Sequence, residues 1–508
     1  MSLTKVTYSM IQGAVVNVFD FMSQAQIASV QARDGGVDVT APIQAAINSL
    51  VIPSYTQRIG QTVTDVKVGT VFFPVGEYVV SSTLELVEAF GVVLQGGGEG
   101  GTRITWKGTG GSVIKFSDTK NCQLNNLDLW VDPAFSCDEV VLLLQNNALL
   151  KVTPTSNQLN DLHIHGNWVT TNGVSVNYTA ADANNDFHEL NSCTIDGYLN
   201  AACYFFGFQA HCLYLTNVGM NGGNFDFTNR LGKYGIEVAS ANVNAAPSVI
   251  VESGACGWHY DADFRLNGIG TNGFQVKNVS GENSNRLLTT NANINSSHII
   301  LENIRYASDG LNADGYFIKN ESGSRLICIG CEFGTNGTVS ASQPKIFLSN
   351  TNAIQANFIN CGFKYSQTGT GVNSTQFSPV YVDPTAAEYA TADIRMTGCS
   401  FTNIYQTTQR SFLVKSGVPA ATTSLDSYYG DTFMLLSYTG ATSIETINAA
   451  YPNQEIVLIV TQPNITIKHN AGGVGQIRLK SGTDFTPTVF PTSIKLKYVA
   501  FQDTWADM

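Results

Sequence analysis

A short pattern of apolar and polar positions recurs along the middle of the chain. Its clearest copy, Ile299–Tyr306, reads apolar, any, apolar, any, small polar, apolar, any, apolar. Two-residue alternation predicts strands, and the break in phase at the fifth position predicts that two strands meet there in a bend. Ten such segments hold a residue at this position that suits a tight bend: Asn126, Asp161, Ser192, Asn217, Ser253, Asn278, Asn303, Gly330, Asn360 and Gly398.

Successive bends lie 25 to 38 residues apart, which is typical of a solenoid whose turns carry loops of different length. Strands that recur in one direction without helices between them stack in parallel, about 4.8 Å apart. We therefore expect an all-β fold, with a right-handed parallel β-helix over residues 65–418. An ordinary β-sandwich is the alternative, although it would not need the polar bend to return ten times.

Both ends of the chain depart from this repeat. Ser23 and Gln26 form a capping-box pattern that predicts a short helix over 24–33, and Thr40 with Pro42 begins a second helix that runs to about Leu50. We expect both helices to cap the solenoid's first turn, within an N-terminal neck and cap of residues 1–64. After a linker rich in Ala, Thr and Ser, alternation without the bend predicts a small β-sandwich-like C-terminal domain over 419–508, with strands at Glu455–Val460, Asn464–His469, Gln476–Lys480 and Ser493–Val499.

Charge and cysteine positions narrow the classes of partner. The chain has 508 residues and a net charge of −12, so we expect no basic surface that would bind nucleic acid. No signal-peptide pattern or apolar stretch of transmembrane length is present, so we expect no membrane insertion. Seven of the ten cysteines fall on apolar positions of the repeat, which predicts a ladder of reduced, buried thiols. The pair Cys328 and Cys331 lacks a second pair at zinc-site spacing.

Five segments are distinctive in combination: Tyr8–Gly13, Val16–Phe21, Asp38–Asn48, Val71–Tyr78 and Leu94–Gly98. They resemble bacteriophage tailspikes, capsular polysaccharide depolymerases with a pectate-lyase-like β-helix, and Tyr8–Gly13 resembles the neck of such spikes. The resemblance implies a homotrimer in the phage tail, part of the virion, that binds and cleaves a bacterial surface polysaccharide, capsule or O-antigen, by glycosidic hydrolysis. It also implies that the C-terminal domain serves trimerisation or carbohydrate contact.

In such spikes a virion-binding domain precedes the neck, and the sequence has no counterpart of it before Tyr8. We expect either a shortened N-terminus or attachment to another phage tail protein through a short peptide.

Candidate catalytic carboxylates lie in two neighbouring repeats. Alternation in His259–Leu266 points the odd-numbered residues outward, with Asp261 and Asp263 among them, and the even-numbered residues inward. In the preceding repeat Glu237 points outward, 24 and 26 residues before the two aspartates. We expect these three carboxylates to lie about one rung, near 5 Å, apart. One would then hold a proton as general acid, and another would act as base or nucleophile in glycoside hydrolysis.

The surrounding side chains are candidates for substrate binding: Trp258, His259, Tyr260, Arg265, Glu282 and Arg286. An acidic ladder neutralised by Arg265, Arg286 and Lys233 is the alternative interpretation. The charged positions beside the bend, with Asp128 and His163 among them, are interpreted as a solvated ladder of this kind. The sequence predicts no cofactor and no metal site.

Three other possibilities stay open. A lyase that cleaves a uronic-acid polymer by β-elimination needs a base, for which His259, Tyr260 and Lys277 are candidates, although the acidic balance of the chain disfavours a polyanionic substrate. An adhesin would bind sugar through Trp and Tyr side chains and cut nothing. The catalytic groups would also lie elsewhere if the active site forms in a groove between subunits.

Overall fold

The computed structural model describes most of the chain. The chain divides into two compact units, Met1–Ser297 and His298–Met508. The described residues are 15–56, 62–145, 156–178, 185–206, 213–224, 228–240, 248–268, 273–291, 298–308, 316–322, 324–335, 346–348, 355–364, 380–382, 393–397, 399–402, 424–426, 432–435, 442–448, 455–460, 465–489, 492–499, 502 and 504–508.

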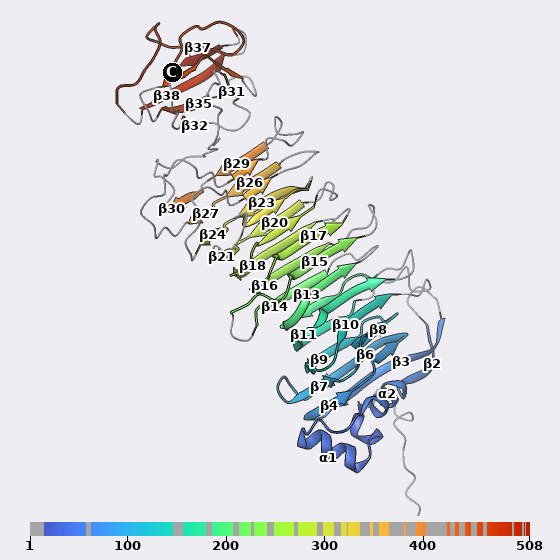
Figure 1. Cartoon of the computed structure of the whole chain (residues 1–508). Helices are drawn as coiled ribbons and strands as arrows, with labels where there is room; N and C mark the ends of the chain where they lie inside the picture. Colours follow the sequence, from blue (N-terminus) through green and yellow to red (C-terminus); the bar gives the residue numbers. More distant parts are fainter. Residues whose placement is uncertain are drawn as a thin grey trace, which may run out of the picture. The chain divides into compact units, whose positions relative to one another are not determined.

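Short helices begin the first unit, as the sequence predicts. β1 (Val15–Asn17) and the 3-10 helix η2 (Val18–Phe21) precede α1 (Gln24–Ala32) and α2 (Thr40–Asn48). The Ser23 hydroxyl accepts a hydrogen bond from the Gln26 N–H, and the Gln26 side chain accepts one from the Ser23 N–H, so the predicted capping box forms. Figure 1 shows both helices beside the first strands of the unit, and α1 contacts β4 while α2 contacts β3 and β5.

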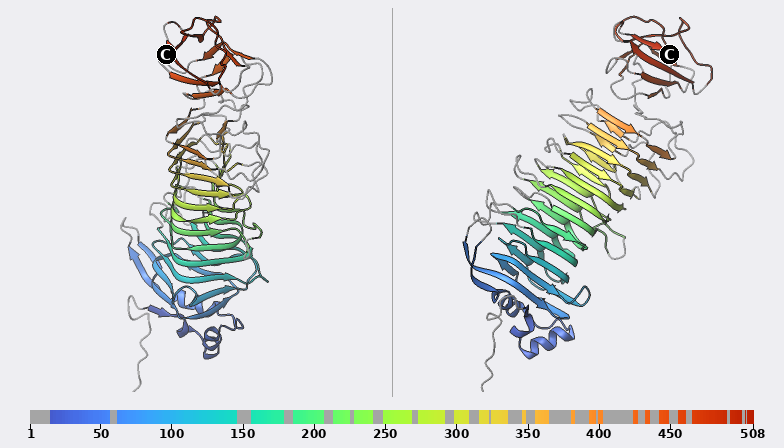
Figure 2. Two further views of the ribbon diagram at one scale, coloured as in Figure 1. Left: turned by 90° about the vertical axis from the view of Figure 1, so that its left-hand side faces the viewer. Right: turned by 180° about the vertical axis from the view of Figure 1, so that it is seen from behind.

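Strands make up most of the rest of the first unit, and Figures 1 and 2 show them stacked one beyond another. They are β2 (Val51–Thr56), β3 (Thr62–Phe73), β4 (Gly76–Val80), β5 (Leu84–Val87), β6 (Ala89–Gly96), β7 (Thr102–Trp106), β8 (Ser112–Ser117), β9 (Gln123–Val131), β10 (Cys137–Gln145), β11 (Gln158–Tyr178), β12 (Glu189–Asn191), β13 (Thr194–Phe206), β14 (Leu213–Asn221), β15 (Tyr234–Ser240), β16 (Val249–Gly257), β17 (Ala262–Gly268), β18 (Phe274–Glu282) and β19 (Leu288–Thr290).

Strands of successive turns pair in parallel. β11 pairs with β9 on one side and β13 on the other, and β15 pairs with β17 in the same sense. β2 and β3 pair antiparallel instead. The pairing confirms the all-β prediction and fits a β-helix, because each strand bonds to the strand one turn further along the chain.

The predicted bends lie where the sequence places them. All nine predicted bend residues that the structure describes have a left-handed backbone, with φ between 53° and 63°. The tenth, Gly398, lies outside the described residues. Asn occupies five of these nine positions, since its side chain tolerates this conformation better than most others do.

Buried thiols form part of the apolar core. Nine cysteines are described, all free, and eight of them are buried. The Cys122 and Cys193 thiols donate to the backbone oxygens of Ala89 and Leu159 at 3.3 and 3.4 Å. Burial raises the pKa of each of these two thiols to about 12, so both stay protonated at neutral pH. The predicted ladder of buried, reduced thiols is confirmed for six of the seven cysteines of the repeat, while Cys399 is half-buried. Cys212 lies outside the described residues.

The second unit has the same kind of pairing at its start, where β20 pairs in parallel with β23, and β23 with β26. Its strands are β20 (His298–Glu302), β21 (Arg305–Ser308), β22 (Ile318–Asn320), β23 (Arg325–Ile329), β24 (Glu332–Thr335), β25 (Ile346–Leu348), β26 (Gln355–Ile359), β27 (Gly362–Lys364), β28 (Val380–Val382), β29 (Asp393–Thr397), β30 (Ser400–Thr402), β31 (Ser424–Asp426), β32 (Thr432–Leu435), β33 (Thr442–Ile444), β34 (Thr446–Asn448), β35 (Glu455–Val460), β36 (Ile465–Ile467), β37 (Gln476–Arg478), β38 (Thr492–Val499) and β39 (Thr504–Asp507).

The last strands form a mixed sheet. Seven of them lie in the order β31-β34-β37-β39-β38-β35-β32, and β33 pairs with β36. Trp505 is fully buried in their core, and its Nε1–H donates to the Ile447 backbone oxygen at 2.7 Å. The four predicted C-terminal strands match β35 to β38, whereas the domain boundaries at 64 and 418 stay predictions. Among the described residues, none of the helices has the length and apolar character needed to cross a membrane.

Candidate functional site

The corner before β17 differs from the predicted one. His259 and Asp263 are fully buried, so the prediction that both face outward is wrong. Tyr260, predicted to point inward, is 62% exposed. The reason is that strand alternation begins only at Ala262, while the preceding residues turn a corner in which Trp258 has a left-handed φ of 60°.

His259 and Asp263 belong to a buried polar network. His259 Nδ1 lies 2.7 Å from Asp263 Oδ1, and His259 Nε2 lies 2.5 Å from the Tyr198 hydroxyl oxygen. The Ser284 hydroxyl donates to Asp263 and accepts a 2.9 Å hydrogen bond from the His259 N–H. Because all four residues are buried, this network stabilises the corner and offers no group to a polysaccharide. Asp263 is therefore no longer a candidate catalytic residue. His259 is no longer a candidate for substrate binding or for the base of a lyase.

Glu237 and Asp261 approach one guanidinium group from two sides. Glu237 Oε1 lies 3.6 Å from Arg265 Nε, and Asp261 Oδ2 lies 3.7 Å from Arg265 Nη1. Residues opposite each other are 28 positions apart between β15 and β17, but 36 apart between β14 and β16. Loops of unequal length separate the strands, so the 25-residue spacing used in the prediction does not apply here. The residue opposite Glu237 on β17 is Arg265. Neither Asp261 nor Asp263 lies opposite it.

Further groups complete this site, which we call the arginine cluster: Tyr234, Glu237, Asp261, Arg265 and Arg286. Arg286 donates to Asp261 Oδ1 at 2.7 Å, and the Tyr234 hydroxyl donates to Oδ2 at 2.9 Å. Burial raises the pKa of Tyr234, so its hydroxyl keeps the proton that it donates. The cluster is partly open to solvent at Asp261 and Arg265, whose side chains are 24% and 29% exposed. Glu237 is only 8% exposed, so the prediction that it faces outward is wrong.

The remaining predicted substrate-binding residues lie around the same corner. Tyr260 stands next to Asp261 in the chain, and its backbone oxygen accepts a hydrogen bond from Asn285 Nδ2. The Trp258 N–H donates to the backbone oxygen of Glu282 at 3.0 Å. Trp258 is half-buried, and Glu282 is exposed at the end of β18. These residues therefore flank the cluster without belonging to its ion pairs.

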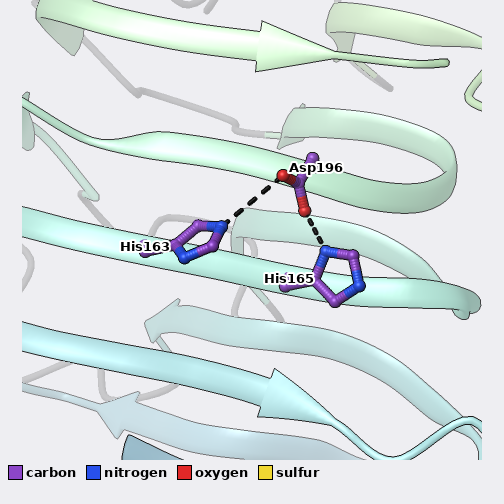
Figure 3. Close-up of side chains that lie close together, drawn as sticks. All are labelled: His163, His165 and Asp196. Atoms are coloured by element: carbon purple, nitrogen blue, oxygen red, sulfur yellow. Dashed lines mark hydrogen bonds and ion pairs between the residues drawn. The ribbon is translucent and has the colours of Figure 1, made fainter. Parts of the chain in front are cut away.

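A second cluster lies on β9, β11 and β13, and the sequence identified only part of it. His163 and His165 stand two positions apart on β11, and Asp196 lies on the neighbouring β13 (Figure 3). His163 Nε2 lies 3.5 Å from Asp196 Oδ2, and His165 Nδ1 contacts Asp196 Oδ1. We call this group, together with Asp128 and Glu99, the histidine cluster.

Asp128 lies at the other ring nitrogen of His163, and Glu99 lies close to both residues. Asp128 is only 3% exposed, and its Oδ1 lies 4.0 Å from His163 Nδ1. Its Oδ2 accepts a 3.2 Å hydrogen bond from the Gly100 N–H and lies 3.7 Å from Arg103 Nη2. Ligand atoms of Glu99, Asp128 and His163 all lie within 4.8 Å of one another.

Aromatic rings surround the inner imidazole of this cluster. The Trp130 ring lies 4.0 Å from the His165 ring, centroid to centroid, and the Trp168 ring meets His165 edge-on at 5.5 Å. The Arg103 guanidinium lies over Trp130 at 4.7 Å. The rings and the guanidinium therefore hold His165 in place beneath the partly exposed His163.

Ion pairing sets the charge state of the cluster. The contact with Asp196 raises the pKa of His163 despite its partial burial. Burial alone would raise the pKa of Asp196, but contacts from His163 and His165 outweigh it and lower that pKa. Asp196 therefore stays ionised at neutral pH, and the cluster can hold a proton or a cation at His163.

The repeat contains the signal that would have found these residues. Asp196 follows His165 by 31 residues, the same distance that separates the bends at Asp161 and Ser192. The interpretation of Asp128 and His163 as a solvated charge ladder is wrong for Asp128, which is buried. His165, Asp196 and Glu99 were missed because the sequence shows contacts across a turn only when the turn lengths are counted.

Comparison with known proteins gives a family-model match within the first unit. Residues 31–256 match the family model described as rhamnogalacturonase A/epimerase, pectate lyase-like. This stretch holds the whole histidine cluster and Glu237, and it ends before Asp261. No curated protein matches the sequence.

Solved structures resemble the chain only distantly. The open reading frame 18 protein of Geobacillus virus E2 is 14% identical with a TM-score of 0.39, over 96% of this chain and 71% of that one. The enzymatically active domain of bacteriophage CBA120 tailspike protein 2 is 12% identical with a TM-score of 0.46, over 73% and 52%. The A-module of the Azotobacter vinelandii mannuronan C-5 epimerase AlgE4 is 14% identical with a TM-score of 0.41, over 78% and 97%. At such low TM-scores these similarities do not indicate the function of this chain.

Proposed function

We propose that this protein is a phage tailspike that binds and depolymerises a bacterial surface polysaccharide, capsule or O-antigen, by glycosidic hydrolysis. One observation carries the proposal. On neighbouring turns of a pectate-lyase-like coil, Glu237 and Asp261 converge on one guanidinium group, in a cluster that is partly open to solvent. Glycoside hydrolysis needs two carboxyl groups on either side of the scissile bond, which such a pair can provide.

We infer the finer architecture from the same features. The parallel pairing and the regular bends support a right-handed parallel β-helix over residues 65–418, between a neck of residues 1–64 and a C-terminal domain of residues 419–508. The sequence resemblance supports a homotrimer that attaches to other phage tail proteins through its N-terminus and acts at the host surface as part of the virion.

In the proposed reaction, one carboxyl group donates a proton to the glycosidic oxygen, and the other activates water or attacks the sugar directly. Arg265 stands between the two, and Arg286 with Tyr234 fixes the orientation of Asp261. Tyr260, with its exposed ring beside Asp261, offers a face on which a sugar ring stacks. Trp258, Glu282 and Arg286 remain the proposed contacts for sugar hydroxyls or acidic groups.

The test compares Glu237→Gln and Asp261→Asn with a matched control, Glu189→Gln, a partly exposed carboxylate on β12. Host polysaccharide is incubated with each variant, and its size is followed by size-exclusion chromatography. We expect at least one of the two cluster variants to cleave about 10²-fold more slowly, the usual scale of a lost general acid or base. Binding of the intact polymer should persist, and the control should match the unaltered protein.

Three results would overturn the proposal in different ways. Normal cleavage by both cluster variants would move the catalytic groups elsewhere, with Glu252, Glu302 and carboxylates at a subunit boundary next to be tested. An ultraviolet-absorbing unsaturated product would identify a lyase instead of a hydrolase. Unchanged polymer size with the unaltered protein, despite binding, would identify an adhesin.

A further inference from the structure

One buried carboxylate oxygen in the histidine cluster lacks a hydrogen-bond partner among the described residues. It is Asp128 Oδ1, on a residue that is only 3% exposed. Leaving a buried polar group unsatisfied costs about 1–3 kcal/mol and more when the group is charged. The other carboxylate oxygen, Oδ2, accepts a hydrogen bond from the Gly100 N–H and lies beside Arg103. The oxygen without a hydrogen-bond partner is therefore the one on the side of His163.

His163 Nδ1 lies on that side, and whether it carries a hydrogen depends on the other ring nitrogen, Nε2. His163 Nε2 lies 3.5 Å from Asp196 Oδ2, and in the neutral tautomer with its hydrogen on Nε2 the ring donates that hydrogen to Asp196. Nδ1 is then a lone-pair nitrogen, 4.0 Å from Asp128 Oδ1. A lone pair and a carboxylate oxygen repel each other unless a cation or an added proton lies between them. A carboxylate that orients a histidine in this way is a usual companion of metal-binding imidazoles.

Glu99 supplies a third donor from an anchored turn. Its carboxylate, Asp128 and His163 offer ligand atoms within 4.8 Å of one another, and ligands at about 2.0–2.4 Å from one ion fall within that separation. Arg33, which follows α1, donates to the backbone oxygens of Gly100 and Gly101. The glycine-rich turn is thus held at both sides, by Arg33 and by Asp128, so Glu99 is presented by a fixed loop.

We propose that Glu99, Asp128 and His163 bind a divalent first-row transition-metal ion, with Zn²⁺ as the probe. A mixed set of one imidazole and two carboxylates suits such an ion, whereas Mg²⁺ and Ca²⁺ take oxygen ligands. Glu99, Asp128 and Asp196 place three carboxyl groups in the cluster with the single guanidinium group of Arg103, a composition that favours a bound cation. Three protein ligands leave a coordination position open, and Glu99 is exposed, so that position is accessible to water or a sugar oxygen.

This metal site is separate from the carboxylates proposed for hydrolysis, and it departs from the sequence expectation that no metal is bound. Asp196 acts in it as a positioning residue, because it fixes the tautomer of His163 without binding the ion. Trp130 and Trp168 pack on His165 rather than on the three ligands, and they limit how far the imidazole pair can move.

The test measures metal, independently of any polysaccharide. Chelator-treated full-length protein is titrated with Zn²⁺ by calorimetry, and bound metal is counted by elemental mass spectrometry, with Mg²⁺ and Ca²⁺ as comparison ions. We expect about one Zn²⁺ per chain and no comparable binding of the other two. Glu99→Gln, on an exposed turn where folding is not at risk, should weaken Zn²⁺ affinity at least about 10-fold, as should His163→Gln. Asp196→Asn should weaken it by about 10- to 100-fold, the scale of a lost orienting carboxylate.

Two matched controls make the result decisive. Glu189→Gln removes a carboxylate elsewhere on the coil. Cys256→Ser removes a thiol that forms, with His259 and Asp263, another described group of metal-ligating side chains, one that shares no residue with the proposed site. Both should leave Zn²⁺ binding unchanged. The proposal is overturned by absence of Zn²⁺ binding, by equal affinity in Glu99→Gln and His163→Gln, or by a loss that follows Cys256→Ser. Because no outcome depends on cleavage, failure here is distinct from failure of the depolymerase proposal.

Discussion

At the scale of single residues, His188 shows how burial turns a side chain into a source of acid sensitivity. It is fully buried, its Nδ1 accepts a 3.2 Å hydrogen bond from the Asn157 N–H, and its Nε2 lies 2.5 Å from Asn185 Oδ1. Both contacts suit a neutral ring with its hydrogen on Nε2. Burial lowers the pKa of His188 to about 3 from the ordinary value of 6.5, so the folded protein keeps the ring uncharged.

The pH dependence follows from this difference. Between pH 6.5 and 3 the unfolded chain binds a proton at His188 that the folded chain does not, so the stability present above pH 6.5 is lost as the pH falls. We expect the free energy of unfolding to lose about 2 kcal/mol from this group alone between pH 6.5 and 5. His188→Gln removes the titrating ring, so urea unfolding of the two proteins at several pH values isolates its share. Parallel pH profiles for the two proteins would contradict the prediction.

Asp261 and Asp263 mark the limit of what the sequence could predict at this scale. Both lie two positions apart in one alternating segment, yet Asp261 is partly exposed in the arginine cluster while Asp263 is buried against His259. Alternation cannot distinguish them, because the corner at Trp258 and the Ser284 hydroxyl come from outside the segment. Replacing Asp263 should therefore disturb folding, whereas replacing an outward-facing carboxylate would have little effect on stability.

At the scale of elements, the bend is the feature that the sequence predicts best. Its signal is local, since a phase break and a small polar residue stand within one eight-residue pattern, and all nine described bends have the left-handed backbone. Helix α1 was also predictable, because its Ser23 and Gln26 capping box is local. The register between β15 and β17 was not, since it depends on the lengths of loops between strands.

The left-handed bend makes a specific stability prediction at Asn278, an exposed residue on β18 with a φ of 53°. Asn278→Val places a β-branched side chain in this conformation and should cost about 1–2 kcal/mol of the free energy of unfolding. Asn278→Gly should be tolerated, because glycine adopts this conformation freely. Thermal or urea unfolding checks both.

Ser280→Val is the matched control for Asn278→Val. Ser280 is exposed on the same strand and is absent from the residues with positive φ, so valine there meets its preferred extended backbone. If the two valine variants lose equal stability, the cost comes from surface hydrophobicity and the bend is not the cause.

At the scale of the whole molecule, the proposed homotrimer predicts that the N-terminal strand β1 contacts a partner chain. Val16 and Val18 are buried, whereas Val15 in β1 is 52% exposed, next to the segment that resembles the neck of tailspikes. An exposed valine in such a strand gains about 25 cal/mol for each Å² that a partner chain covers. A charge at this position would oppose association of the chains without disturbing the fold of each chain. A substitution here therefore distinguishes a contact between chains from a contact needed for folding.

We therefore expect light scattering to give three times the chain mass of 54.6 kDa for the unaltered protein. Val15→Asp should shift the population toward lower mass at dilute concentration, because burying an unpaired carboxylate at an interface is costly. Val474→Asp, at a residue of the second unit that is 69% exposed, is the control and should leave the mass unchanged. A monomer mass for the unaltered protein would refute the trimer, whereas a trimer that Val15→Asp leaves intact would keep the assembly and move its contacts away from β1.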